Sequence, residues 1–110
     1  SDANVGELVR GVTANRVELD NLVAAVLTED WTVERLDNIL RAILRAGVYE
    51  LSAHEEVPAR VAVSEYVELA DAFLTGKEIG LVNGVLDQLA RLLRPGEMGV
   101  TGGGRTIPAG

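Results

Sequence analysis

Apolar residues in the early part of the chain recur at spacings of three and four residues. The positions are Val5, Leu8, Val9, Val12, Leu19, Leu22, Val23 and Val26. This spacing matches the helical period of about 3.6 residues, so it predicts an amphipathic helix over about residues 4–27. The polar pair Asn15-Arg16 interrupts the apolar stripe midway, and a bend or break at that point is an alternative to one continuous helix.

The same period predicts three further helices, over about residues 39–53, 58–74 and 79–93. A short turn over residues 33–36 precedes them, with Thr32 as its cap. Gly76 is predicted to end the third long helix, and the loop after it would then carry Lys77. Gly47 lies within an apolar stripe, where glycine costs about 1 kcal/mol relative to alanine. We therefore expect a neighbouring helix to approach closely at Gly47.

No alternating pattern of apolar and polar residues competes with the helical period. The expected fold is all-α, a compact helical bundle of four main helices plus one short helix. We assign residues 1–95 to one helical domain. Residues 96–110 hold six of the twelve glycines and show no periodicity, so we expect them to form a flexible glycine-rich tail.

Composition narrows the functional classes. The 110 residues carry a formal charge of −7, which argues against a self-sufficient binder of the phosphate backbone but leaves open a basic protein partner or a local RNA-binding patch. The sequence has no Cys and a single His, so a disulfide framework, a thiolate zinc site and a Cys nucleophile are excluded. No apolar run approaches the roughly 18 residues of a membrane span. We expect no cofactor, no metal and no catalytic residue.

Two groups have both a functional and a structural interpretation. Arg41 and Arg45 stand one turn apart and would form an anion grip, although pairing with acids of the next helix, such as Glu65 or Glu68, is the favoured interpretation. Gly80 and Gly84 would expose backbone N–H groups to an anion, although close helix packing is favoured. The single histidine, His54, is expected at a helix end without a metal or nucleophile partner, and Tyr49 and Tyr66 are expected to pack across two helices.

Four ordered motifs resemble the NusB family of bacterial transcription antitermination factors. They are Tyr-Glu-Leu at 49–51, Val-Pro at 57–58, Glu-x-x-Glu-Leu-Ala at 65–70 and Val-Asn-Gly-Val-Leu-Asp at 82–87, within a match over roughly residues 5–95. The resemblance implies an all-helical fold of two subdomains and a cytoplasmic, non-catalytic adaptor. It also implies as partners boxA RNA, the ribosomal protein NusE and the RNA polymerase antitermination complex.

The family's N-terminal subdomain begins with an arginine-rich segment that helps to bind boxA RNA. We expect this chain to begin after that segment, and therefore to keep the C-terminal subdomain with weakened RNA binding. For contacts with RNA or a protein partner we select Glu34, Arg35 and Arg41, which should be exposed, together with Lys77 and Asn83 near the start of the last helix.

Two alternatives remain open. The chain also resembles the NusB-like domain of rRNA cytosine methyltransferases, an RNA-targeting module, although Gly84 and Asp87 favour NusB itself. A homodimer is a further expectation, because the apolar face of the first helix would invite self-association.

Overall fold

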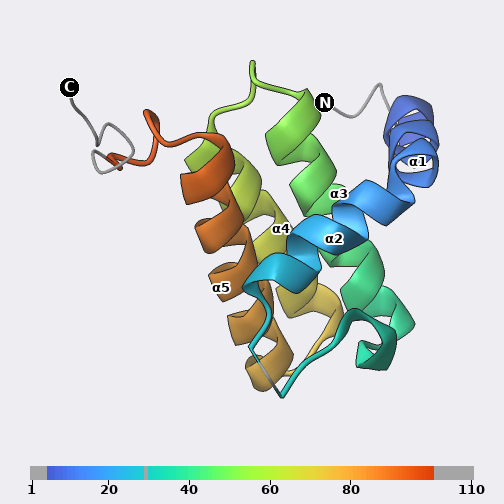
Figure 1. Cartoon of the computed structure of the whole chain (residues 1–110). Coiled ribbons are helices and arrows are strands. Elements are labelled where there is room, and N and C mark those ends of the chain that lie inside the picture. The colour runs from blue at the N-terminus through green and yellow to red at the C-terminus, as the bar shows by residue number, and fades with distance from the viewer. Residues whose placement is uncertain (1–4, 29, 101–110) are drawn as a thin grey trace.

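The computed structural model describes residues 5–28 and 30–100. Within them the fold is all-α, as expected, and consists of five α-helices and one short 3-10 helix. The helices are α1 (Val5–Ala14), α2 (Arg16–Val26), α3 (Asn38–Ala53), α4 (Ala59–Phe73) and α5 (Gly76–Leu93), with η2 (Val33–Arg35) between α2 and α3. Helices α3, α4 and α5 lie alongside one another, α2 crosses over them, and α1 stands at one side (Figure 1).

The expected first helix is two helices that meet at Asn15. The Asn15 backbone leaves the helical region, with φ −113° and ψ 18°. Its side-chain amide donates to the carbonyl oxygen of Gly11 at 2.8 Å, so the side chain competes with the backbone for helical hydrogen bonding. The interruption in the apolar stripe therefore marks a break rather than a gentle bend, and it allows α2 to turn across the bundle while α1 stays at its edge.

The core lies between α3, α4 and α5, where the largest fully buried side chains of these helices are Leu40, Leu44, Leu51, Leu86, Leu89, Val48 and Val82. Gly47 confirms the close approach that its position predicted. A Cβ atom at Gly47 would lie 2.8 Å from Leu86 Cδ1 and 3.4 Å from Tyr66 Cγ. The missing side chain is thus what lets α3 pack directly against both α4 and α5.

Helix α5 begins three residues earlier than expected, at Gly76 rather than near residue 79. The cause is a capping box between Thr75 and Glu78. The backbone N–H of Glu78 donates to the Thr75 side-chain oxygen, and the backbone N–H of Thr75 donates to the Glu78 carboxylate at 3.3 Å. The glycine at 76 is therefore the first residue of α5, and Lys77 lies in its first turn rather than in a preceding loop.

The segment after α5 packs on the body of the molecule as far as it is described. Met98 is buried, and Gly99 takes a left-handed conformation with φ +72°, which turns the chain so that the Val100 N–H donates to the Pro95 carbonyl oxygen at 2.9 Å. Residues 96–100, expected as part of a flexible tail, therefore form a packed turn. The rest of the expected tail, 101–110, lies outside the described residues.

Candidate partner and nucleic-acid interface

A contact between Trp31 and Lys77 joins the connection before η2 to the start of α5. The Lys77 ammonium lies 5.9 Å from the centre of the Trp31 ring, within the range of a cation–π interaction. Lys77 is exposed, and so are Glu34 and Arg35 on η2. Three of the five predicted contact residues are therefore exposed on η2 and on the first turn of α5. Helices α3 and α5 begin at the same end of the molecule (Figure 1).

Arg41 is half-buried rather than exposed. Its Nη2 donates to the Leu36 carbonyl oxygen at 3.1 Å and to Asn38 Oδ1 at 3.4 Å. Its Nε is buried and, among the described residues, has no hydrogen-bond partner. The guanidinium thus holds the end of η2 against the first turn of α3, and a partner would reach only its remaining exposed part.

Arg45 pairs with Asp20 of α2, so the favoured pairing with Glu65 or Glu68 is wrong. Its Nε and Nη2 donate to the two Asp20 carboxylate oxygens at 2.7 and 2.8 Å. Arg45 lies on the side of α3 that faces α2, away from α4 and its acids. The hydrogen bond from Arg45 lowers the pKa of Asp20 below its usual value, and the bidentate pair ties α2 to α3.

Asn83, the fifth predicted residue, is exposed on α5 but lies about 120° around the helix axis from Lys77. The structure does not group it with the other four. A Cβ atom added at Gly80 or Gly84 would meet no other atom within 4 Å, so the close-packing interpretation is wrong within the described residues. Both glycines also lie inside α5, where backbone N–H groups bond within the helix and are not free for an anion.

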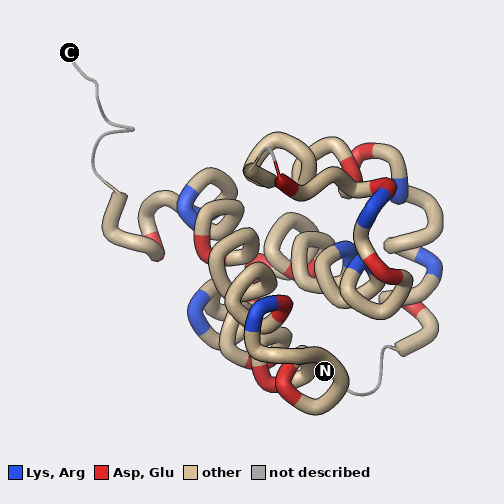
Figure 2. Tube along the Cα trace, turned by 90° about the horizontal axis from the view of Figure 1, so that it is seen from below, with Lys and Arg blue, Asp and Glu red and all other residues tan. Residues whose placement is uncertain are grey.

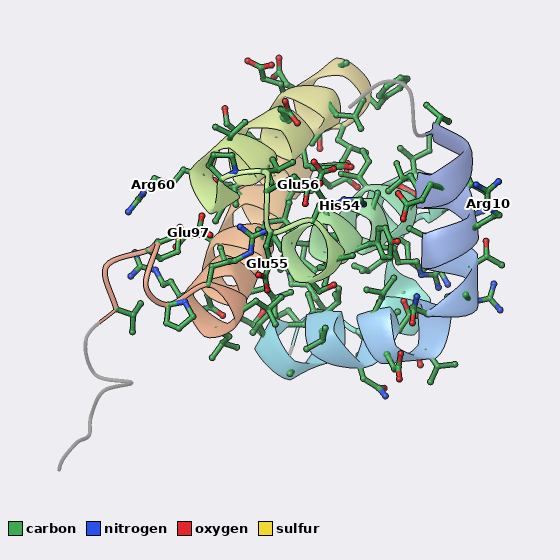
Figure 3. The ribbon with its side chains drawn as sticks, turned by 90° about the horizontal axis from the view of Figure 1, so that it is seen from above. Arg10, His54, Glu55, Glu56, Arg60 and Glu97 are labelled. Carbon is green, nitrogen blue, oxygen red and sulfur yellow. The ribbon has the colours of Figure 1, made fainter. Side chains whose placement is uncertain are left out.

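His54 is the centre of a polar cluster that the sequence did not reveal. Its Nε2 lies 3.0 Å from Glu7 of α1, and its Nδ1 lies 2.9 Å from Glu56 in the connection after α3. Tyr49 donates a hydrogen bond to the same Glu7 carboxylate. Figure 3 shows His54 and Glu56 at the end of α3, facing α1. The cluster therefore joins α1 to the α3–α4 connection.

The charges in this cluster support one another. Hydrogen bonds to Glu56 and then to Glu7 raise the pKa of His54. The hydrogen bond from Tyr49, followed by that from His54, lowers the pKa of Glu7. Gly11 leaves room for the Tyr49 ring, because any Cβ atom at position 11 would collide with that ring. Tyr49 thus faces α1, while Tyr66 donates to Glu50 at 2.9 Å, so the two tyrosines serve different contacts.

Arg94 is a second feature missed at the sequence level. It is only 5% exposed, and it donates to the carbonyl oxygens of Leu51 at 2.9 Å, Val57 at 2.9 Å and His54 at 2.8 Å. Its ion-pair partner Glu97, at 2.8 Å, accepts the Ala59 backbone N–H at 2.7 Å. A basic residue at a helix end can bond exposed carbonyls, but the sequence did not indicate that these would be carbonyls at the end of α3 and in the connection after it.

Charges of both signs are interspersed along the chain in Figure 2, and no continuous basic band is visible on that side. Within residues 5–28 and 30–100, no three His, Cys, Asp or Glu side chains are grouped so that they would hold a metal ion. No helix in this part of the chain is long and apolar enough to span a membrane. Arg35 and Lys77 are exposed, Trp31 is half-buried, and Lys77 contacts the Trp31 ring.

Similarity to known proteins points to one family. The NusB family model matches residues 2–91. The chain is 52% identical over 91 residues to a protein of Nitrobacter hamburgensis, covering 83% of this chain and 57% of that relative. It is 50% identical over 92 residues to one of Rhodospirillum rubrum, covering 84% and 50%. Both are named transcription antitermination protein NusB.

A solved structure described as T. maritima NusB superimposes with a TM-score of 0.73 at 33% identity, covering 77% of this chain and 59% of that one. The chain thus spans about half the length of the curated relatives that it matches. These relatives are named as antitermination proteins and not as enzymes, in agreement with the expectation of a non-catalytic factor. From the family match, the sequence identity and the shared fold, the chain belongs to the NusB family.

Proposed function

We propose that this protein is a non-catalytic adaptor in bacterial transcription antitermination, working in the cytoplasm. It would bind a NusE-type ribosomal protein and boxA RNA and so connect the RNA to the elongating polymerase. The observation that carries the proposal is the 52% identity to a named antitermination protein over 83% of the chain. The names of these relatives favour this function over the alternative of a methyltransferase targeting domain.

The RNA contact would lie at the Trp31–Lys77 end. Arg35 and Lys77 are exposed and supply positive charge for phosphates, and the half-buried Trp31 offers part of an aromatic surface. The logarithm of the RNA-binding constant falls with the logarithm of the salt concentration, with a slope of about −0.7 for each phosphate contact to single-stranded RNA. Two cations would therefore give a slope of about −1.4. RNA binding by this surface alone would be weak and would gain from a second protein that completes it.

The protein contact would use the opposite charge. A net charge of −7 complements a basic ribosomal protein, and such complementarity speeds encounter and disfavours wrong partners. The exposed Glu34 beside Arg35 places one acid next to the proposed RNA surface. A partner bound there would bring its own basic residues close to the RNA, which fits an adaptor with a composite RNA-binding surface.

Binding to NusE tests the proposal directly. Calorimetric titration of the chain with NusE from the same bacterium should give a 1:1 complex with a dissociation constant below about 10 µM, corresponding to about −7 kcal/mol. Absence of binding at that concentration would contradict the proposed function.

Self-association is a second proposal, carried by the exposed apolar residues of α1. Val5 and Val9 are 61% and 58% exposed, and α1 buries none of its residues. Light scattering over a concentration series should show a dimer that the double change of Val5 and Val9 to Ser weakens. A concentration-independent monomer mass would rule out this proposal.

A further inference from the structure

A groove between α3 and α4 is lined by apolar side chains although it is open to solvent. It has a volume of about 300 Å³ and is formed by Ile39, Ala42, Ile43, Ala46, Leu69 and Phe73. Ile39, Leu69 and Phe73 are 49%, 41% and 62% exposed. The small side chains of Ala42 and Ala46 form the hollow between these larger ones. None of its lining residues belongs to the Trp31–Lys77 surface proposed for RNA.

The exposure of these residues is costly for the isolated protein. Phe73 is the only phenylalanine of the chain, and burying such a side chain is worth about 1.5–3 kcal/mol. Leu69 and Phe73 are spaced by four residues and so present one continuous ridge along α4. Contiguous exposed apolar surface of this kind is typical of protein interaction sites.

The charges beside the groove are negative. Glu65 lies one turn before Leu69 on the same side of α4, and Glu68 lies about 100° around the helix axis from Leu69. Both are exposed, and neither forms an ion pair within 4 Å among the described residues. The arginines of α3 do not balance them. Arg41 bonds to the end of η2 and Arg45 pairs with Asp20, both away from the groove.

We propose that this groove is the docking site for a basic protein partner, which inserts apolar side chains between Ile39, Leu69 and Phe73 while its Lys or Arg side chains meet Glu65 and Glu68. The inference rests on the proposed function for the existence of such a partner, and it deepens that function by assigning the surface. It commits to a positively charged protein segment, because a second copy of this chain would bring further negative charge to an acidic rim.

The test compares groove variants with a matched control in binding to NusE. Leu69→Ser and Phe73→Ser remove the apolar ridge, and Leu92→Ser removes an equally apolar side chain that is 65% exposed on α5, outside the groove. We expect Phe73→Ser to weaken binding about 30-fold, as for a central interface residue, and Leu69→Ser by about 10-fold. Leu92→Ser should bind as the unchanged chain does. Circular dichroism melting curves check that all variants fold.

Charge-reversal variants test how Glu65 and Glu68 contribute to association with NusE. The double change Glu65→Lys and Glu68→Lys should slow association by about 10-fold at low salt and by less at high salt, because exposed charges steer encounter. Glu18→Lys, at an exposed position on α2, is the control and should have a smaller effect.

The outcomes separate the two proposals. If the unchanged chain fails to bind NusE, the proposed function and the groove assignment both fall. If the unchanged chain binds and the folded Phe73→Ser and Leu69→Ser variants bind equally well, only the groove assignment is overturned. If these variants instead convert a dimer to a monomer without changing NusE affinity, the occupant is a second copy, which also overturns the assignment.

Discussion

The core of α3, α4 and α5 buries Leu86 and Val48 completely, whereas α1 buries none of its residues. The core is held by apolar packing, which depends little on pH. Helix α1 is attached through the polar cluster of Glu7, Tyr49 and His54 and through Leu8 and Val12, which are only partly buried. One small domain thus has a rigid part and an attached part, and each can be disturbed separately.

The largest expected effect is a cavity in the rigid part. Leu86→Ala removes a fully buried side chain between α3 and α5 and should lower the free energy of unfolding by about 2–5 kcal/mol. Leu8→Ala on α1 should cost less than about 1 kcal/mol, since Leu8 is only partly buried. Urea denaturation measures both. Equal losses would contradict the division into two regions.

The next largest effect concerns the buried Arg94. Arg94→Met keeps much of the side chain's apolar stem but removes the hydrogen bonds to Leu51, Val57 and His54, and it should cost about 2–3 kcal/mol. The same change at the exposed Arg91, whose partner Asp87 is also solvent-accessible, should cost less than about 1 kcal/mol. Thermal melting of the two variants makes the comparison, and a stable Arg94→Met protein would show that the carbonyls are satisfied in another way.

The attachment of α1 should depend on pH. His54 has a raised pKa in the folded protein, so its contribution is complete below its ordinary value of 6.5 and is lost as pH rises through the folded value. Glu7 has a lowered pKa, so its contribution is complete above 4.5 and is lost as pH falls through its own folded value. Docking of α1 should therefore be strongest between about pH 4.5 and 6.5.

Nuclear magnetic resonance can test this pH dependence. The His54 ring should titrate above pH 6.5, and amide exchange in α1, corrected for its intrinsic pH dependence, should become faster above that midpoint while α5 stays protected. His54→Gln should remove the change in α1 and leave α5 unaltered. A midpoint at or below 6.5 would mean that Glu7 and Glu56 do not hold the ring in solution.

The smallest expected effect is the link between α2 and α3. A double-mutant cycle with Asp20→Asn and Arg45→Gln should give a coupling energy of about 0.5–1 kcal/mol, because the pair is bidentate but partly solvent-exposed. The coupling should shrink in 1 M salt, where the Debye length is about 3 Å. A coupling near zero at low salt would leave apolar packing by Leu19 and Val23 as the main attachment of α2.

Much of the fold was predictable because apolar spacing decides helical faces. The spacing located the helical segments but predicted α1 and α2 as one helix, and Gly47 indicated close packing before any neighbour was known. It could not decide between a bend and a break at Asn15, since that depends on a side-chain hydrogen bond to Gly11. It placed the start of α5 too late, because the Thr75 capping box outweighs the glycine that follows it.

The candidate site was less predictable, because side-chain partners depend on tertiary geometry. Spacing along α3 placed Arg41 and Arg45 one turn apart but did not show that they would face η2 and α2. The residues around His54 come from α1 and the α3–α4 connection, separated by more than forty positions. The apolar stripe of α3 includes Ile39, yet Ile39 is half-exposed beside the groove, since a helical stripe does not show where its covered part ends.

Titration of fluorescently labelled boxA RNA with this protein, in the absence and presence of NusE, is the most direct test of the adaptor function. We expect weak binding by the protein alone and at least about 10-fold tighter binding with NusE, a gain of about 1.4 kcal/mol. A control titration of the RNA with NusE alone should not reproduce the tight complex. An RNA affinity of this protein that is the same with and without NusE would contradict the adaptor function.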